Sequence, residues 1–75
     1  MYKILVLEDD CIQRRTLSEI IRNCSALYQV YEADNIQEAL AVVHAERIDL
    51  FYVDINLKKE SGLKFADEIR NGLYL

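Results

Sequence analysis

The stretch DLFYVDIN, residues 49–56, decides how the rest of the sequence is interpreted. Four apolar residues in a row, Leu50–Val53, are typical of a strand buried on both faces, as in a parallel sheet. The run ends in a carboxylate, Asp54. Because burying a charged group costs free energy, we expect Asp54 to lie where the strand opens into a cleft. Ligands bind beyond the carboxyl ends of such strands, so Asp54 is the first candidate functional residue.

Strand and helix patterns alternate along the rest of the chain. A second apolar run, Ile4–Leu7, also ends in acids, whereas residues 27–33 alternate in polarity and suit an edge strand. Apolar residues at helical spacing predict helices over residues 11–23, around 36–43 and at about 62–70. This βαβαβα order predicts a parallel sheet with right-handed crossovers. If the polar strand lies outside the first strand and the third strand lies on the first strand's other side, the spatial order is 2-1-3, and the acid-tipped ends meet where the winding reverses.

The first helix has a clear apolar stripe. Its predicted buried residues are Leu17, Ile20, Ile21 and Cys24. Ser18, Arg14 and Arg15 fall outside this stripe and are expected on the exposed side. Solvated surface is the default interpretation of the two arginines, and a docking face for a kinase is the alternative. Asp10 precedes the helix and could be its N-cap or a member of an acid site.

Composition limits the kind of protein. Seventy-five residues allow one small domain, and 52% apolar residues argue against disorder. Nine Lys and Arg against 13 Asp and Glu give a net charge of −4, which argues against direct nucleic-acid binding by this segment. We expect no membrane span, no signal peptide and a cytoplasmic location. Cys11 and Cys24 lack metal-site spacing and are expected to be free thiols.

Four acids are predicted to converge at one edge of the sheet: Glu8, Asp9, Asp10 and Asp54. Carboxylates that lie close together repel one another unless they are protonated or bridged by a cation. An oxygen-only ligand set suits Mg²⁺, and a carboxylate beside bound Mg²⁺ can attack phosphorus to form an aspartyl phosphate. The alternative is that these acids only cap the following helix or are solvated.

The whole chain resembles the receiver domain of bacterial two-component response regulators, possibly of the LytTR-type group. The matching segments are ILVLEDD (4–10), EADN (32–35), EAL (38–40), DLFYVDINL (49–57), Gly62 and Ile69-Arg70. The resemblance implies a flavodoxin-like (CheY-like) doubly wound parallel sheet, here truncated to βαβαβα. Residues 1–75 would then be a partial receiver domain, covering about the first three of its five β/α units.

The resemblance also implies a function for the acid residues. Asp54 would be the phosphoacceptor for a sensor histidine kinase, and Glu8, Asp9, Asp54 and the backbone carbonyl of Asn56 would hold Mg²⁺. Such a module is a switch that catalyses only its own phosphotransfer and dephosphorylation. Transcription control through DNA would need an output domain that is absent from these 75 residues.

Two other functions stay open, a Mg²⁺-dependent phosphatase or nuclease-like enzyme and a receiver-like interaction module that is not phosphorylated. With the later strands missing, the third strand would present an open apolar edge. We therefore expect the segment to self-associate or to exchange strands with a second copy.

Overall fold

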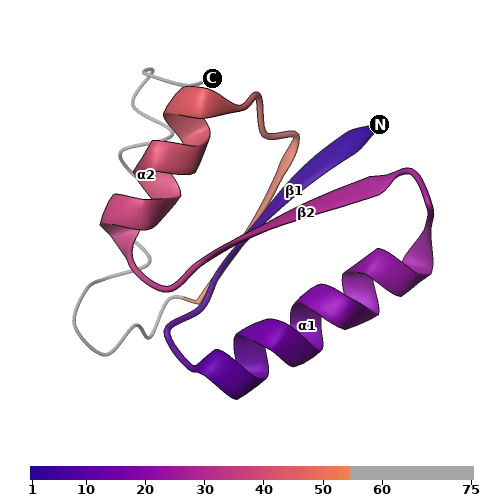
Figure 1. Ribbon diagram of the computed structural model, residues 1–75, viewed down its shortest axis with the longest axis horizontal. Coiled ribbons are helices and arrows are strands. Elements are labelled where there is room, and N and C mark those ends of the chain that lie inside the picture. Colours follow the sequence, from indigo (N-terminus) through magenta and orange to yellow (C-terminus); the bar gives the residue numbers. More distant parts are fainter. Residues whose placement is uncertain (55–75) are drawn as a thin grey trace.

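A computed structural model describes residues 1–54, which form a three-layer α/β unit. The elements are β1 (Tyr2–Leu7), α1 (Cys11–Cys24), β2 (Tyr28–Ala33), α2 (Ile36–Ala45) and β3 (Leu50–Val53). Figure 1 shows α1 and α2 on opposite sides of the sheet. The alternating order is confirmed as far as β3. The helix expected at 62–70 and the carbonyl of Asn56 lie outside the described residues.

All strand pairs are parallel, and β1 is central, so the sheet order is β2-β1-β3 as predicted. Leu7 at the end of β1 pairs with Ala33 on one side and with Val53 on the other. The residues that follow β1 and β3 therefore emerge next to each other. This is the point at which the winding direction reverses, where α/β sheets bind ligands.

The main core lies between the sheet and α2. It contains Leu5 and Leu7 of β1, both fully buried, together with Ala33, Ile36 and Ala39. The predicted apolar stripe of α2 thus faces the sheet. The helix begins at an Asn35 cap, whose side chain accepts a hydrogen bond from the Glu38 amide. The Glu38 carboxylate in turn accepts from the Asp34 amide, so two N–H groups that the helix cannot satisfy find partners.

The buried face of α1 agrees only in part with the predicted one, because Leu17 and Ile21 are half-buried beside the sheet but the other two residues are not. Ser18 is fully buried, whereas Ile20 is 57% exposed and Cys24 is also exposed. The helix lies over β2 and part of β1, and Ser18 is the buried residue of this helix. Because two residues turn a helix by about 200°, Ile20 points away from the sheet. The small serine side chain permits close approach, which the hydrophobic pattern could not reveal.

Replacing Ser18 by alanine is expected to stabilise the protein by about 1 kcal/mol. The buried Ser18 hydroxyl has no hydrogen-bond partner among the described residues, and an unsatisfied buried group costs about 1–3 kcal/mol. Urea unfolding of wild type and Ser18→Ala measures the change. Ser25→Ala is the control, because the Ser25 hydroxyl oxygen accepts from the Leu27 amide and its loss should destabilise. A less stable Ser18→Ala protein would contradict the interpretation.

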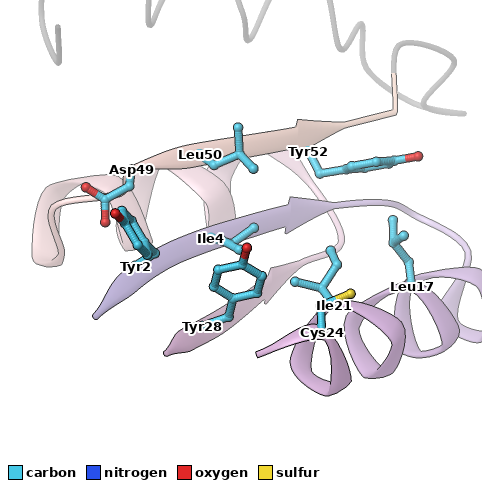
Figure 2. A pocket seen from close by; sticks show the side chains of 9 residues that line it. All are labelled: Tyr2, Ile4, Leu17, Ile21, Cys24, Tyr28, Asp49, Leu50 and Tyr52. Atoms are coloured by element: carbon cyan, nitrogen blue, oxygen red, sulfur yellow. The ribbon is translucent and has the colours of Figure 1, made fainter. Parts of the chain in front are cut away.

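The prediction that β3 is buried on both faces is wrong for the described part of the chain. Phe51 and Val53 pack against the α2-side core, but Leu50 is 58% exposed and Tyr52 is 51% exposed. The physical reason is that α1 packs chiefly over β2 and to a lesser extent over β1, and covers β3 less than either. The uncovered face forms an open apolar hollow of about 440 Å³ (Figure 2).

The hollow is lined by side chains from β1, β2, β3 and α1 (Figure 2). At one end Tyr2 and Tyr28 meet edge to face, with ring centroids 6.3 Å apart. These tyrosines pack between neighbouring strands, as expected for residues paired across a parallel ladder.

No helix within residues 1–54 has the length and apolar character needed to cross a membrane.

Candidate functional site

Three acids meet at the carboxyl edge of the sheet. Glu8 and Asp9 follow β1 directly, and Asp54 follows β3 directly. The backbone continues the strand pairing here, because the Asp54 amide donates to the Leu7 carbonyl at 2.9 Å. One carboxylate oxygen from each of the three acids lies within 4.8 Å of the others. Asp54 lies 45 residues after Asp9 in the sequence, and the structure brings it together with Glu8 and Asp9.

Asp10 has a different position and a local structural role. It is the N-cap of α1, with an extended backbone, and its side chain accepts a hydrogen bond from the Gln13 amide at 2.9 Å. This contact satisfies one of the amides that the first helical turn leaves without a partner. The alternative left open by the sequence is thereby decided, since Asp10 caps the helix and does not join the cluster of three.

Glu8 is the most buried of the acids, with 9% of its surface exposed. Burial raises the pKa of its carboxyl group, and the hydrogen bond and negative charge of Asp54, with the charge of Asp9, raise the pKa further. The Asp10 amide, which donates to the Glu8 carboxylate at 3.0 Å, acts in the opposite direction. Glu8 is thus a carboxyl group whose charge is unfavourable until a cation or a proton arrives.

Arg14 is the residue at this site that the sequence interpretation missed. It was expected on the exposed side of α1, but its side chain is only 18% exposed. Its guanidinium donates to the backbone carbonyl of Glu8 at 2.9 Å and pairs with Glu32 of β2 at 3.5 Å. The sequence feature that could have indicated a buried Arg14 is an acidic residue, Glu32, on the strand next to β1. Helical periodicity alone ranks Arg14 as surface because it contains no information about the neighbouring strand.

The chemistry of the cluster fits a hard divalent cation. Its donors are carboxylate oxygens only, which suit Mg²⁺ and do not suit the thiol- and imidazole-binding metals. Burial and the negative charges of Asp54 and Asp9 raise the pKa of Glu8, and a bound divalent cation would offset both effects. Cys11 and Cys24, the two cysteines, are free and exposed, in agreement with the sequence prediction.

Replacing Glu8 by glutamine should stabilise the metal-free protein at neutral pH. A carboxyl group whose pKa is raised by folding contributes stability below its unfolded pKa, near 4.5, and that contribution is lost as pH rises through the folded value. Ionised Glu8 therefore opposes folding at pH 7, and glutamine removes that opposition. Urea unfolding in EDTA should show a gain at pH 7 that shrinks towards pH 4. Saturating Mg²⁺ should stabilise wild type more than Glu8→Gln.

Glu46→Gln is a control of opposite sign. In the wild type, the hydrogen bond that Lys3 donates at 2.9 Å lowers the pKa of the Glu46 carboxyl group, so ionised Glu46 favours folding. That contribution is present above about pH 4.5 and is lost as pH falls through the lowered folded pKa. Glu46→Gln should therefore slightly destabilise the protein at pH 7. The two glutamine variants shifting in the same direction would contradict the assignment of Glu8.

Comparison with known proteins matches this chain to regulators of one kind. The response regulator receiver domain family matches residues 4–73. The chain is 35% identical over 68 residues to the sensory transduction protein LytR of Staphylococcus haemolyticus, covering 91% of this chain and 27% of that protein. The LytR protein of Streptococcus agalactiae is 30% identical over 69 residues, with 89% and 28% covered. The chain thus spans about a quarter of the length of these curated relatives.

Solved structures agree with this match. A chain in the crystal structure of histidine kinase ThkA in complex with response regulator protein TrrA superimposes with a TM-score of 0.83 at 35% identity, covering 96% of this chain and 60% of that one. The chemotaxis response regulator CheY4 of Vibrio cholerae gives a TM-score of 0.84 at 29% identity, with 96% and 58% covered. The predicted CheY-like fold is confirmed. This chain belongs to the response regulator receiver domain family.

Proposed function

We propose that this chain is the phosphoacceptor part of a two-component response regulator and that Asp54 accepts the phosphoryl group. One observation carries the proposal: Asp54 leaves β3 at the switch point of the sheet, with its carboxylate within 4.8 Å of those of Glu8 and Asp9. A carboxylate can act as a nucleophile when its surroundings position it and compensate the charges that meet there.

The residues have separate roles in the proposed reaction. An oxygen of Asp54 forms a bond to phosphorus while the bond from phosphorus to the kinase imidazole nitrogen breaks, and the electron pair of that bond stays on the imidazole. Glu8, Asp9, Asp54 and the backbone carbonyl of Asn56 would hold Mg²⁺. When bound, Mg²⁺ supplies neutralisation of the phosphoryl oxygens. By holding Mg²⁺, Glu8 and Asp9 would allow a site built from negative carboxylates to accept the negatively charged phosphoryl group.

Incubation of the intact protein with acetyl phosphate and Mg²⁺ tests this function. The expected product is a stoichiometric adduct on Asp54 that is stable in acid and labile in base, as an acyl phosphate should be. Steady hydrolysis of the donor without an adduct would favour the Mg²⁺-dependent phosphatase. Neither adduct nor hydrolysis would favour an unphosphorylated interaction module.

The partners belong to the same proposal. The ThkA–TrrA structure is a complex of a histidine kinase with a response regulator, which supports a sensor histidine kinase as phosphoryl donor here. A further relative, from Staphylococcus aureus, is a transcriptional regulatory protein LytR, of which the chain covers 28%. We infer that DNA is contacted by an output domain beyond these 75 residues, since the chain itself carries a charge of −4. A cytoplasmic location stays a prediction.

Residues 1–75 correspond in this proposal to about the first three β/α units of a receiver. The span supports it, because the chain covers 58% of the chemotaxis response regulator CheY4 chain that it matches. Leu50 and Tyr52, half or more exposed on an apolar face, support self-association of the 75-residue segment. Sedimentation velocity over a range of concentrations should show dimers or larger species. A monomer that melts cooperatively would refute this expectation.

A further inference from the structure

We propose that Arg14 is a positioning residue for the acid site, holding the turn that carries Glu8 and Asp9 in the geometry that binds the cation. This inference deepens the proposed function and rests on it. Arg14 acts through the backbone of the acid turn and through Glu32 of the edge strand, the two groups that its guanidinium contacts.

The contacts of Arg14 form a continuous link from the edge strand to the acid turn. Its Nη1 donates to the Glu8 carbonyl at 2.9 Å, and its Nε lies 3.5 Å from Oε1 of Glu32. The other oxygen of Glu32 lies 3.2 Å from Nη2 of Arg22, further along α1. Glu32 is therefore held between two arginines. A guanidinium fork can make both contacts of Arg14 at once, because its donors point in fixed, different directions.

Glu8 is anchored on every polar group of its backbone and on its side chain. Its amide donates to the Ala33 carbonyl at 3.1 Å, and its carboxylate accepts from the Asp10 amide at 3.0 Å. The bond that Arg14 donates holds the Glu8 carbonyl. Without it, the peptide that joins Glu8 to Asp9 loses a charge-assisted hydrogen bond and gains freedom to rotate. Rotation of that peptide would move both carboxylates relative to Asp54.

Charge alone predicts the opposite result from positioning. Arg14 brings a positive charge near three carboxylates, and a positive charge weakens the binding of a second cation. If charge dominated, removal of Arg14 would tighten Mg²⁺ binding. If positioning dominates, removal loosens the ligand set and weakens binding, as is typical when outer-shell partners of a metal site are mutated. The sign of the change therefore separates the two effects.

Mg²⁺ titration calorimetry on the intact protein, at a temperature where circular dichroism shows all variants folded, provides the test. We expect Arg14→Met to weaken Mg²⁺ binding by about tenfold, the lower end of the range for outer-shell partners. Arg14→Lys should also weaken it, because an ammonium does not reproduce the fork. Glu32→Gln should weaken it in the same direction. The double variant Arg14→Met/Glu32→Gln should bind Mg²⁺ only slightly more weakly than Arg14→Met, because both substitutions break the same link from β2 to the acid turn.

Arg15→Met is the matched control, because it removes the same charge from the neighbouring, exposed position of α1. The Mg²⁺ affinity of Arg15→Met should stay within about twofold of wild type, because salt screens the charge of an exposed side chain. Arg22→Met is the control for general destabilisation, since it breaks the other pair of Glu32 and leaves the bond from Arg14 to Glu8 in place. It should lower the melting temperature without weakening Mg²⁺ binding by more than about twofold.

A second readout does not depend on the cation. In the metal-free protein, amide hydrogen exchange at Asp10, whose N–H donates to the Glu8 carboxylate, should be faster in Arg14→Met than in Arg15→Met. Equal exchange in the two variants, or Mg²⁺ binding in Arg14→Met as tight as in Arg15→Met, would overturn the inference. Failure of the proposed function looks different, because wild type itself would then form no adduct on Asp54.

Discussion

Asp54→Asn is expected to abolish phosphoryl transfer to this protein. The amide keeps the shape of the side chain but is not a nucleophile, so the covalent step has no acceptor and labelling should fall by at least about 10³-fold. The measurement is incorporation of phosphate from acetyl phosphate or a partner kinase, with Mg²⁺ present. The fold should survive, because the substitution removes one of three crowded like charges and leaves the backbone bond from residue 54 to the Leu7 carbonyl in place.

Asp10→Asn is the matched control for the loss of an acid near this site. It removes one negative charge from the same edge of the sheet, and asparagine caps helices as well as aspartate does. Because Asp10 caps α1 outside the cluster of three, this variant should be labelled at a rate close to wild type. Labelling that persists in Asp54→Asn, or that disappears equally in Asp10→Asn, would show that Asp54 is not the specific acceptor.

Leu5→Ala is expected to cost the fold about 2–5 kcal/mol, the range measured for emptying a buried leucine site. Leu5 is fully buried in the central strand and belongs to the core against α2. Small domains have only a few kcal/mol of net stability, so a large fraction of the variant should be unfolded at physiological temperature. Urea unfolding followed by circular dichroism measures the loss.

Leu50→Ala makes the same chemical change on the neighbouring strand. Because Leu50 is 58% exposed in the single chain, the loss should be below about 1 kcal/mol at protein concentrations low enough for the chain to be monomeric. The comparison also reports on the apolar face in solution. If Leu50→Ala lowers the free energy of unfolding as much as Leu5→Ala does, another protein segment or a second copy covers the apolar face, and Leu50 is buried in solution.

Much of the fold could be predicted because the deciding signals are local. The apolar runs before Glu8 and Asp54 predict two parallel strands, and the mixed polarity of β2 predicts its place at the edge. The strand order also required the third strand to lie on the other side of the first, which the family resemblance implied, and the order is confirmed. A capping box at the start of α2 could be expected, with Gln37 three residues after Asp34 and Glu38 three after Asn35, and the structure decides for Asn35.

The meeting of the acids could also be anticipated, because strands that run parallel as neighbours end at the same edge. Their exact membership could not. Asp10 is the same residue type as Asp9 and adjacent to it, and the distinction is one of direction, since the side chain of Asp10 turns to the Gln13 amide. That turn depends on where the first helical residue begins, a boundary that sequence patterns locate poorly.

Which strands form and which acids follow them were determined by the sequence alone, since hydrophobic periodicity acts over a few residues. The order of the strands was expected only with the help of the family resemblance. Tertiary structure alone decided that Ser18 and Arg14 turn inward and that Leu50 and Tyr52 stay exposed. These outcomes depend on where α1 lies across the sheet. The helix packs against β2, whose Glu32 pairs with Arg14, and neither contact is encoded in the helix's own pattern.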